Sequence, residues 1–282
     1  MSLNRKPHIF VVGNEKGGAG KTTCSMHLII GLLDRGYHIA SIDVDSRQGS
    51  LSSYINNRKL YNDKNPGKKV LMPVHFHIQD STAKSITDKE EEEKNRFEQV
   101  LDQVKDYADY IVIDTPGSYT HLSRFAHSYA DTVITPVNDS FLDLDVMAKI
   151  DSETFDTVKP SIYSQMIWEQ KMERAARDKG SIDWVVLRNR LANLDAHNKR
   201  NVHDALEKLS KRISFRIAPG FSERVIFREL FPQGLTLLDL KVANYNKAFS
   251  ISHVAARQEL RSFLEALGIK SLEKKEGVAA GL

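Results

Sequence analysis

The residues best suited to chemistry lie near the start of the chain, in the segment VVGNEKGGAGKTTC from Val11 to Cys24. Gly17, Gly18 and Gly20 allow the backbone to curl so that consecutive N–H groups point at one anion. A helix that begins directly after them would add the positive end of its dipole and its unpaired N–H groups. The segment therefore predicts a loop that binds the phosphates of a nucleotide.

The end of this loop carries the two side chains that complete such a site. Lys21 would contact the β- and γ-phosphates as a point charge, and the Thr22 hydroxyl would bind Mg²⁺. The alternative is a glycine-rich turn that binds nothing, but Gly-Lys-Thr at a helix start has little structural reason to occur by itself. The predicted phosphate-binding residues are Gly17, Gly18, Ala19, Gly20, Lys21, Thr22 and Thr23.

A second lysine, Lys16, is not part of the ordinary phosphate-loop pattern. The strict spacing G-x-x-x-x-G-K-[ST] is not met, because Gly13 lies two residues too early and Glu15 stands where a glycine is expected. Two ammonium groups around one triphosphate are possible in a single chain but are not needed. A lysine that projects away from its own loop could instead reach phosphates held by a second copy of the protein.

Acidic residues follow two predicted strands at their carboxyl ends. Asp43 ends the run HIASID and Asp45 follows it, whereas Asp114 ends the run YIVID. In an open parallel sheet, ligands bind beyond the carboxyl ends of the strands. We expect Asp114 to hold Mg²⁺ directly or through water. For either motif taken alone, a carboxylate that caps a turn is the alternative.

The elements that position these residues are predicted from short apolar runs that alternate with helical patterns. The predicted strands are 8–13, 38–43, 110–114, 131–137, 183–187 and 213–217, and the predicted helices are 21–35, 88–107, 160–178, 198–212 and 252–267. Several strands are apolar at nearly every residue, as strands buried on both faces are. This order predicts an α/β fold with a mainly parallel twisted sheet and helices on both faces. We expect one domain, 1–268, and a flexible tail, 269–282.

The composition is that of an ordinary globular protein of 282 residues, with 41% hydrophobic and 27% charged residues. The single cysteine, Cys24, excludes a disulfide framework and a cysteine-ligated cluster within one chain. No segment resembles a signal peptide, and no apolar run approaches the roughly 20 residues of a membrane helix. We therefore expect a cytoplasmic protein.

Positive charge is concentrated between Arg188 and Arg228, where ten basic and four acidic residues give +6 in a chain whose net charge is +3. The predicted helix 198–212 places Val202, Leu206 and Leu209 on one apolar stripe. Its basic residues lie mostly off that stripe and could bind DNA phosphates without sequence preference. The alternative is a solvated helix with i,i+4 ion pairs, and the sequence does not decide between them. The candidate DNA contacts are Lys199, Arg200, Lys208, Lys211, Arg212, Arg216 and Arg224.

The stretch KGGAGKTT resembles the deviant Walker A motif of the ParA/MinD ATPases. The resemblance implies an ATP- and Mg²⁺-dependent homodimer in which Lys16 crosses to the partner's site. It implies that Asp45 orients the attacking water, and a pKa of about 3.9 makes an ordinary aspartate a better water-positioner than proton acceptor. It also implies that Asp43 and Asp114 lie near the metal and that the Gly117 backbone senses the γ-phosphate. The nucleotide base would contact Asn189, Arg190 and Pro219, although Asn189 could equally be a simple turn residue.

Longer segments, including TPVNDSF, DWVVLRNRL and FRIAPGFSERVIFRELFPQGLTLLDL, are similar to the MipZ group of these ATPases. That resemblance implies a nucleoid-associated protein that binds double-stranded DNA non-specifically, interacts with a ParB-type centromere-binding protein and inhibits FtsZ assembly. The alternatives are a ParA-type partition ATPase, a small-molecule ligase or kinase, and a nitrogenase-like reductase, for which Cys24 is poorly placed. A membrane-cycling regulator is a further alternative. The final segment LRSFLEALGI has apolar residues at helical spacing, but Arg261 is its single basic residue, whereas a membrane anchor is rich in Lys and Arg. We therefore expect a packing helix and no membrane partner.

Overall fold

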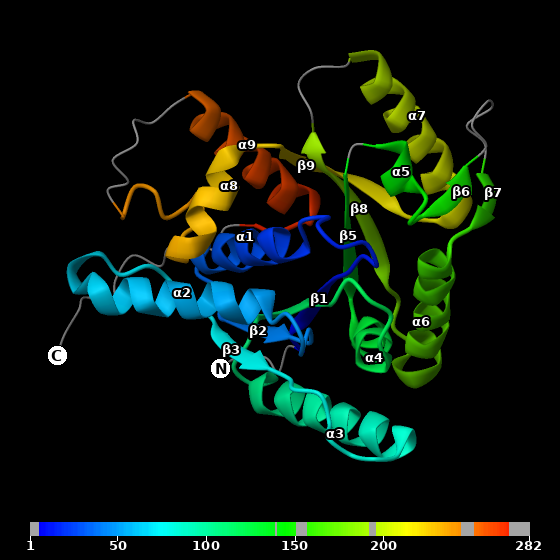
Figure 1. Cartoon of the computed structure of the whole chain (residues 1–282), viewed down its shortest axis with the longest axis horizontal. Helices are drawn as coiled ribbons and strands as arrows, with labels where there is room; N and C mark the ends of the chain where they lie inside the picture. Colours follow the sequence, from blue (N-terminus) through cyan, green and yellow to red (C-terminus); the bar gives the residue numbers. More distant parts are fainter. Residues whose placement is uncertain (1–5, 139, 151–156, 192–195, 244–250, 271–282) are drawn as a thin grey trace.

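The computed structural model describes residues 6–138, 140–150, 157–191, 196–243 and 251–270 (Figure 1). Its centre is a parallel sheet of seven strands in the order β3-β2-β4-β1-β5-β8-β9. These strands are β1 (His8–Val12), β2 (Ile39–Asp43), β3 (Val74–His77), β4 (Tyr110–Asp114), β5 (Thr132–Asn138), β8 (Asp183–Leu191) and β9 (Arg216–Ser222). A separate antiparallel pair is formed by β6 (Ala148–Ile150) and β7 (Thr157–Pro160). The predicted α/β fold with a parallel sheet is confirmed.

Helices cover both faces of the sheet (Figure 1). The α-helices are α1 (Lys21–Asp34), α2 (Ser50–Lys64), α3 (Ile86–Val104), α4 (His121–Tyr129), α5 (Phe141–Leu144), α6 (Ile162–Asp178), α7 (Ala196–Ile213), α8 (Val225–Leu230) and α9 (Ile251–Ala266). Two short 3₁₀ helices are η1 (Pro66–Lys68) and η2 (Phe231–Gln233).

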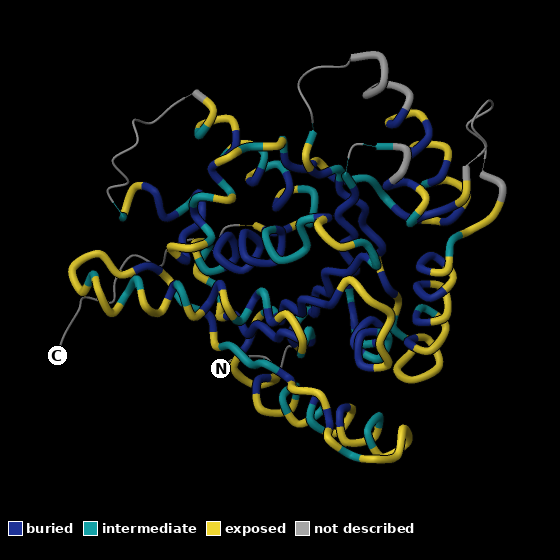
Figure 2. Tube along the Cα trace, viewed as in Figure 1, coloured by how far each residue is buried: buried dark blue, intermediate teal, exposed yellow. Residues whose placement is uncertain are grey.

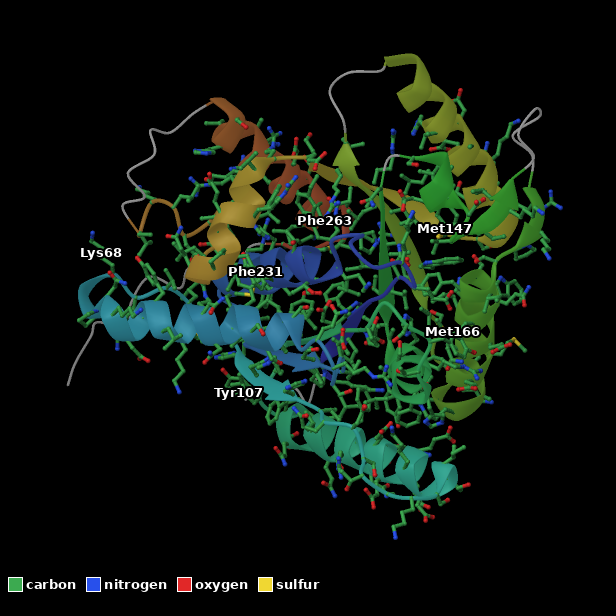
Figure 3. The ribbon with its side chains drawn as sticks, viewed as in Figure 1. Lys68, Tyr107, Met147, Met166, Phe231 and Phe263 are labelled. Carbon is green, nitrogen blue, oxygen red and sulfur yellow. The ribbon has the colours of Figure 1, made fainter. Side chains whose placement is uncertain are left out.

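The apolar strands explain this layering, because successive side chains of a strand point to opposite faces. In β1, Ile9 and Val11 pack with α3, α4, α6 and α7, whereas Phe10 and Val12 pack with α1, α2 and α9. Figure 3 labels members of the two layers, among them Met166 on the α6 side and Phe263 on the α1 side. Helices therefore cover both faces of the sheet and exclude water from them. The ends of the strands are the part of the sheet that can form a site.

Helix α1 is the most deeply placed helix, since nine consecutive residues from Cys24 to Leu32 are buried (Figure 2). It packs against α9 at Gly31, where an added Cβ would lie 2.6 Å from a methyl carbon of Leu264. A helix enclosed in this way gives the loop that precedes it a rigid base.

A buried ion pair holds α2 to the segment after η2. The guanidinium group of Arg58 bonds both carboxylate oxygens of Asp239 at 2.7 Å and also donates to the carbonyl oxygens of Leu71 and Gly234. Both side chains are almost fully buried. The charge is thus paired and its donors are satisfied, as a buried charge requires.

The structure differs from the sequence-based predictions at several elements. The last predicted strand, 213–217, is shifted, because α7 continues to Ile213 and β9 begins at Arg216. Strand β3, the β6–β7 pair and helices α2, α4 and α8 were not predicted. Ile269 is buried against the α1 side of the core, so packing continues past the predicted boundary at 268. The rest of the predicted tail, residues 271–282, lies outside the described residues.

Candidate nucleotide-binding site

The carboxyl ends of three adjacent strands meet beside one loop. In register, Asp43 of β2 pairs with Asp114 of β4, and Val12 of β1 lies opposite Asp114 on the other side. The loop that follows β1 runs from Gly13 to Gly20 and leads into α1. The structure therefore brings the two acidic motifs and the predicted phosphate loop together.

The loop has the backbone that the glycines predict. Gly18 and Gly20 have φ values of +76° and +89°, which side chains disfavour. The loop is also held from below by Asn14, whose Nδ2 donates to the carbonyl oxygen of Pro136 and whose Oδ1 accepts the Lys16 N–H. Asn14 is buried and was not among the predicted residues, because nothing in its spacing showed that it contacts β5.

Lys21 lies inside the loop. Its Nζ donates to the carbonyl oxygen of Lys16 at 3.1 Å, and a Cβ added to Gly117 would be 3.3 Å from that Nζ. Burial lowers the pKa of Lys21, while the nearby carboxylates of Asp114 and Asp45 act in the opposite direction. The Lys21 ammonium group and the Gly117 backbone thus lie next to each other beside the loop.

Asp114 is linked to α1 by two hydroxyl groups. Thr22 Oγ1 donates to Oδ2 at 2.8 Å, and Ser25 Oγ donates to Oδ1 at 2.7 Å. Burial raises the pKa of Asp114 to about 7, with a further contribution from Asp43, although both hydroxyl groups and Lys21 oppose the rise. Sequence reasoning missed Ser25, which follows Thr22 by three residues and so lies on the same side of α1.

Asp43 has a structural role in addition to its predicted place near the metal. Its Oδ1 accepts the Asp45 N–H, and its Oδ2 accepts both the N–H and the hydroxyl of Ser52. His75 of β3 lies on the same hydroxyl, with Nε2 at 3.0 Å from Ser52 Oγ. Asp43 thus holds the turn after β2 and the first turn of α2 in place.

Asp45 lies on that turn, half-exposed and at the edge of the site. Its Oδ1 accepts the Gln48 N–H, and its carbonyl oxygen accepts the Gly49 N–H. Its negative charge opposes the lowering of the Lys21 pKa that burial causes.

Lys16 points to a different part of the molecule from Lys21. Its Nζ forms an ion pair with Asp143 Oδ1 of α5 at 2.5 Å, while 39% of the Lys16 side chain remains exposed. Asp143 itself is buried. The two lysines of the loop therefore have different partners, and sequence reasoning did not identify Asp143 as one of them.

A pocket of about 290 Å³ adjoins the end of the loop and matches the predicted base-binding region in part. Gly20, Asn189 and Arg190 line it, and Asn189 Nδ2 donates to the carbonyl oxygen of Ala19 at 2.8 Å. Pro219 is exposed and is not among the lining residues. Phe227 and Phe231, from the α8–η2 region, supply an apolar wall that the sequence did not indicate.

The basic residues proposed for DNA differ in their surroundings. Lys208, Lys211 and Arg212 are exposed on α7. Arg216 is bonded to Asp183 and to the Ala266 carbonyl, and Arg224 is paired with Glu259 with only 15% of its side chain exposed. These two are therefore engaged within the chain. The side chains of Lys199 and Arg200 lie outside the described residues.

A divalent cation fits the residues around Asp114. Two carboxylates stand side by side there, and burial, with a further contribution from Asp43, raises the pKa of Asp114. Oxygen ligands of this type suit Mg²⁺ when it is also bound to phosphates. Within the described part of the chain, no cluster of three or more His, Cys, Asp or Glu side chains could hold a metal ion. Among the described helices, none is long and apolar enough to span a membrane.

Comparison with known proteins gives one family and several more distant relatives. The model of the ATPase MipZ family matches residues 8–271. An uncharacterised protein of Methanocaldococcus jannaschii is 27% identical over 160 residues, covering 48% of this chain and 61% of the relative, so the chain spans less than two thirds of that relative's length. The chromosome partitioning protein ParA of Myxococcus xanthus is 25% identical over 245 residues, covering 80% of this chain and 83% of ParA.

A solved structure, the ATP complex of a single-residue variant of Cyanothece McdA, has a TM-score of 0.64. It is 19% identical to this chain and covers 95% of it, and the match covers 99% of McdA. At that identity the likeness shows the shared fold. Because the family model matches nearly the whole chain and the phosphate loop with its two lysines is in place, this chain belongs to the ATPase MipZ family, a group of ParA/MinD-type ATPases.

Proposed function

We propose that the protein is an ATP-dependent dimerisation switch with slow, Mg²⁺-dependent ATP hydrolysis. The observation that carries the proposal is the divergence of the two loop lysines. Lys21 Nζ lies within its own loop, whereas Lys16 Nζ lies on α5 with part of its side chain exposed. A second copy that presents its triphosphate would offer Lys16 a stronger charge than the carboxylate it now contacts.

The chain's own residues would then have distinct tasks. The loop backbone and Lys21 bind the triphosphate, and Asn189 and Arg190 border the base. Thr22 and Asp114 would hold Mg²⁺, which neutralises charge on the phosphates when it is bound. Asp45 would position the attacking water. Because Asp45 would position the water without accepting its proton, we expect slow turnover that depends on dimerisation.

The test is sizing by light scattering in ADP and in a non-hydrolysable ATP analogue. The wild type should be monomeric with ADP and dimeric with the analogue. Lys16→Ala should still bind nucleotide but remain monomeric, whereas Lys21→Ala should lose nucleotide binding. Loss of nucleotide binding in both variants would show that Lys16 serves its own site.

As its output, the dimer would bind double-stranded DNA non-specifically, respond to a ParB-type centromere-binding protein and regulate division-site placement by inhibiting FtsZ assembly, in the cytoplasm and on the nucleoid. Family membership supports these roles. The match to a ParA supports a second candidate, a partition ATPase that moves DNA cargo. Polymerisation of purified FtsZ separates the two, since only the first candidate should inhibit it.

DNA binding would use the exposed basic residues of α7. Replacing Lys211 and Arg212 with Gln should weaken binding to random duplex DNA. The slope of the logarithm of the binding constant against the logarithm of the salt concentration should become less negative by about one for each lost phosphate contact. Fluorescence anisotropy across a salt series measures both quantities. Lys59→Gln with Lys64→Gln on α2 is the matched control and should leave both unchanged.

A further inference from the structure

The edge strand β3 presents two histidines toward the turn that carries Asp45. His75 and His77 are two residues apart in this strand, so their side chains lie on the same face of the sheet (Figure 1). In the strand register His75 lies opposite Ser41 of β2. His77 lies opposite Asp43, at the carboxyl end of the same strand. Both histidines are half-buried, and each of their ring nitrogens has a hydrogen-bond partner.

His75 is linked to Asp45 through two intermediate groups. Its Nδ1 lies 2.9 Å from Ser41 Oγ, and its Nε2 lies 3.0 Å from Ser52 Oγ. The Ser52 hydroxyl has one hydrogen, which it donates to Asp43 Oδ2 at 2.9 Å, so the Nε2–H of His75 is the donor to Ser52. Asp43 Oδ1 in turn accepts the Asp45 N–H at 3.0 Å. A continuous chain of hydrogen bonds therefore runs from His75 to the backbone of Asp45.

His77 contacts the same turn directly. Its Nε2 lies 3.2 Å from the carbonyl oxygen of Asp45, which can only accept, so the Nε2–H is the donor. The amide nitrogen of Gln79 lies 2.9 Å from Nδ1 and donates to it, which selects this tautomer. A Cβ added to Gly49, which follows the turn, would be 3.1 Å from the His77 ring. The Asp45 N–H is therefore held through Asp43, and the Asp45 carbonyl group is held by His77.

These contacts determine where the Asp45 side chain lies. The residue is half-exposed at the edge of the site, so its position depends on the backbone that carries it. A displacement of about 1 Å can cost an enzyme about 100-fold in rate, even when its origin is remote from the reacting atoms. Groups that orient a functional carboxylate through hydrogen bonds therefore affect the reaction without touching the substrate.

We propose that His75 and His77 are positioning residues for ATP hydrolysis, which hold the Asp45 carboxylate where it can orient the attacking water. The inference rests on the proposed role of Asp45. It also gives β3 a task in the reaction, because the strand that carries both histidines pairs with β2 alongside Ser41 and Asp43.

The test compares three replacements of His75 in steady-state ATP hydrolysis by the full chain. Gln carries an amide N–H at about the reach of Nε2, whereas Asn carries one only at the reach of Nδ1 and Leu carries none. His75→Asn and His75→Leu should each lower kcat about tenfold, with an unchanged KM for ATP and an unchanged dimer fraction in the non-hydrolysable analogue. His75→Gln should keep the kcat of the wild type. The matched control is His38→Asn, at an exposed histidine that precedes β2, and its kcat should not change.

A double change tests whether His75 acts through Ser52. Ser52→Ala removes the next link of the chain, so His75→Leu should lower kcat no further in that background. If circular dichroism shows that the His75 variants do not fold, the same comparison at His77 decides the inference. His77→Gln should then keep the kcat of the wild type, and His77→Asn should lower it.

Wild-type kcat in both His75→Asn and His75→Leu would overturn the inference. A loss of kcat in parallel with a loss of ATP affinity or of the dimer would overturn it too, because it would show a structural role alone. Asp45→Ala separates the inference from the proposed function. If Asp45→Ala abolishes hydrolysis while the His75 variants hydrolyse normally, only the inference fails. Normal hydrolysis by Asp45→Ala would overturn the proposed role of Asp45, and the inference with it.

Discussion

At the scale of single residues, Asp143 and the triphosphate of a second copy would compete for the Lys16 ammonium group. The ion pair occupies the ammonium group that the proposed dimer needs. Asp143→Asn should weaken that contact and raise the dimer fraction at a given protein concentration with the ATP analogue. Sedimentation velocity measures the change, and Asp145→Asn, an exposed neighbour with the same charge change, is the control. A lower dimer fraction in Asp143→Asn would mean that Asp143 supports Lys16 in the dimer rather than competing for it.

Asp114 makes a prediction about pH. Its pKa is raised to about 7, so the folded nucleotide-free protein binds a proton there that the unfolded chain releases near pH 4. Between these values the unfolded state binds fewer protons, and the contribution of Asp114 to stability therefore falls as pH rises. Thermal melts of Asp114→Asn from pH 5 to 7.5 should show a less negative dependence of Tm on pH than the wild type. The control is Asp106→Asn, at an exposed site. If the Tm of Asp114→Asn depends on pH as strongly as the Tm of the wild type and of this control, a group other than Asp114 binds the proton.

Residue types and spacing indicated the phosphate loop and the strand-end carboxylates, because those chemistries depend on neighbours in the sequence. They could not indicate the contact of Lys16 with Asp143 or that of Asp43 with Ser52. Each of these contacts joins segments whose relative position is set by tertiary packing. Asn14 was missed for the same reason, since its amide bonds a carbonyl group 122 residues away.

At the scale of elements, the close approach of α1 and α9 gives a stability prediction. Gly31→Ala would place a methyl group against Leu264, and overpacking costs about 1–3 kcal/mol. The gain in helix propensity offsets at most about 1 kcal/mol of this. Urea unfolding should therefore show a lower midpoint. Gly67→Ala, at a position with open space, is the control.

A second substitution distinguishes steric crowding from a general effect on α1. Leu264→Ala should cost less in the Gly31→Ala background than in the wild type, because the added methyl group fills part of the space. Equal costs in both backgrounds would show that the two positions do not interact.

The elements that were predicted and those that were not differ in burial. The strands β1, β2, β4 and β5 are apolar and buried on both faces, and their patterns are unambiguous. In contrast, β3 is the sequence VHFH at the sheet edge and has no buried residue. Helix α2 buries four residues among many polar ones, so its amphipathic pattern is weak.

At the scale of the whole molecule, the pair formed by Arg58 and Asp239 connects segments that are 181 residues apart. Replacing Arg58 with Met should cost about 3–5 kcal/mol, because Asp239 would be left buried and unpaired. The double change Arg58→Met with Asp239→Leu should cost clearly less than the sum of the single changes. Chemical unfolding of the four proteins measures this cycle, and additive costs would contradict the pairing.

The pairing of Arg58 with Asp239 also predicts how these two positions vary among members of the family. A mutation that replaced Arg58 alone would leave the Asp239 carboxylate buried and unpaired, and the fold would be less stable. A second mutation that replaced Asp239 would then restore part of the lost stability. In a deep alignment of the family, the two positions should therefore change together or not at all, whereas the neighbouring exposed residues of α2 should drift independently of both.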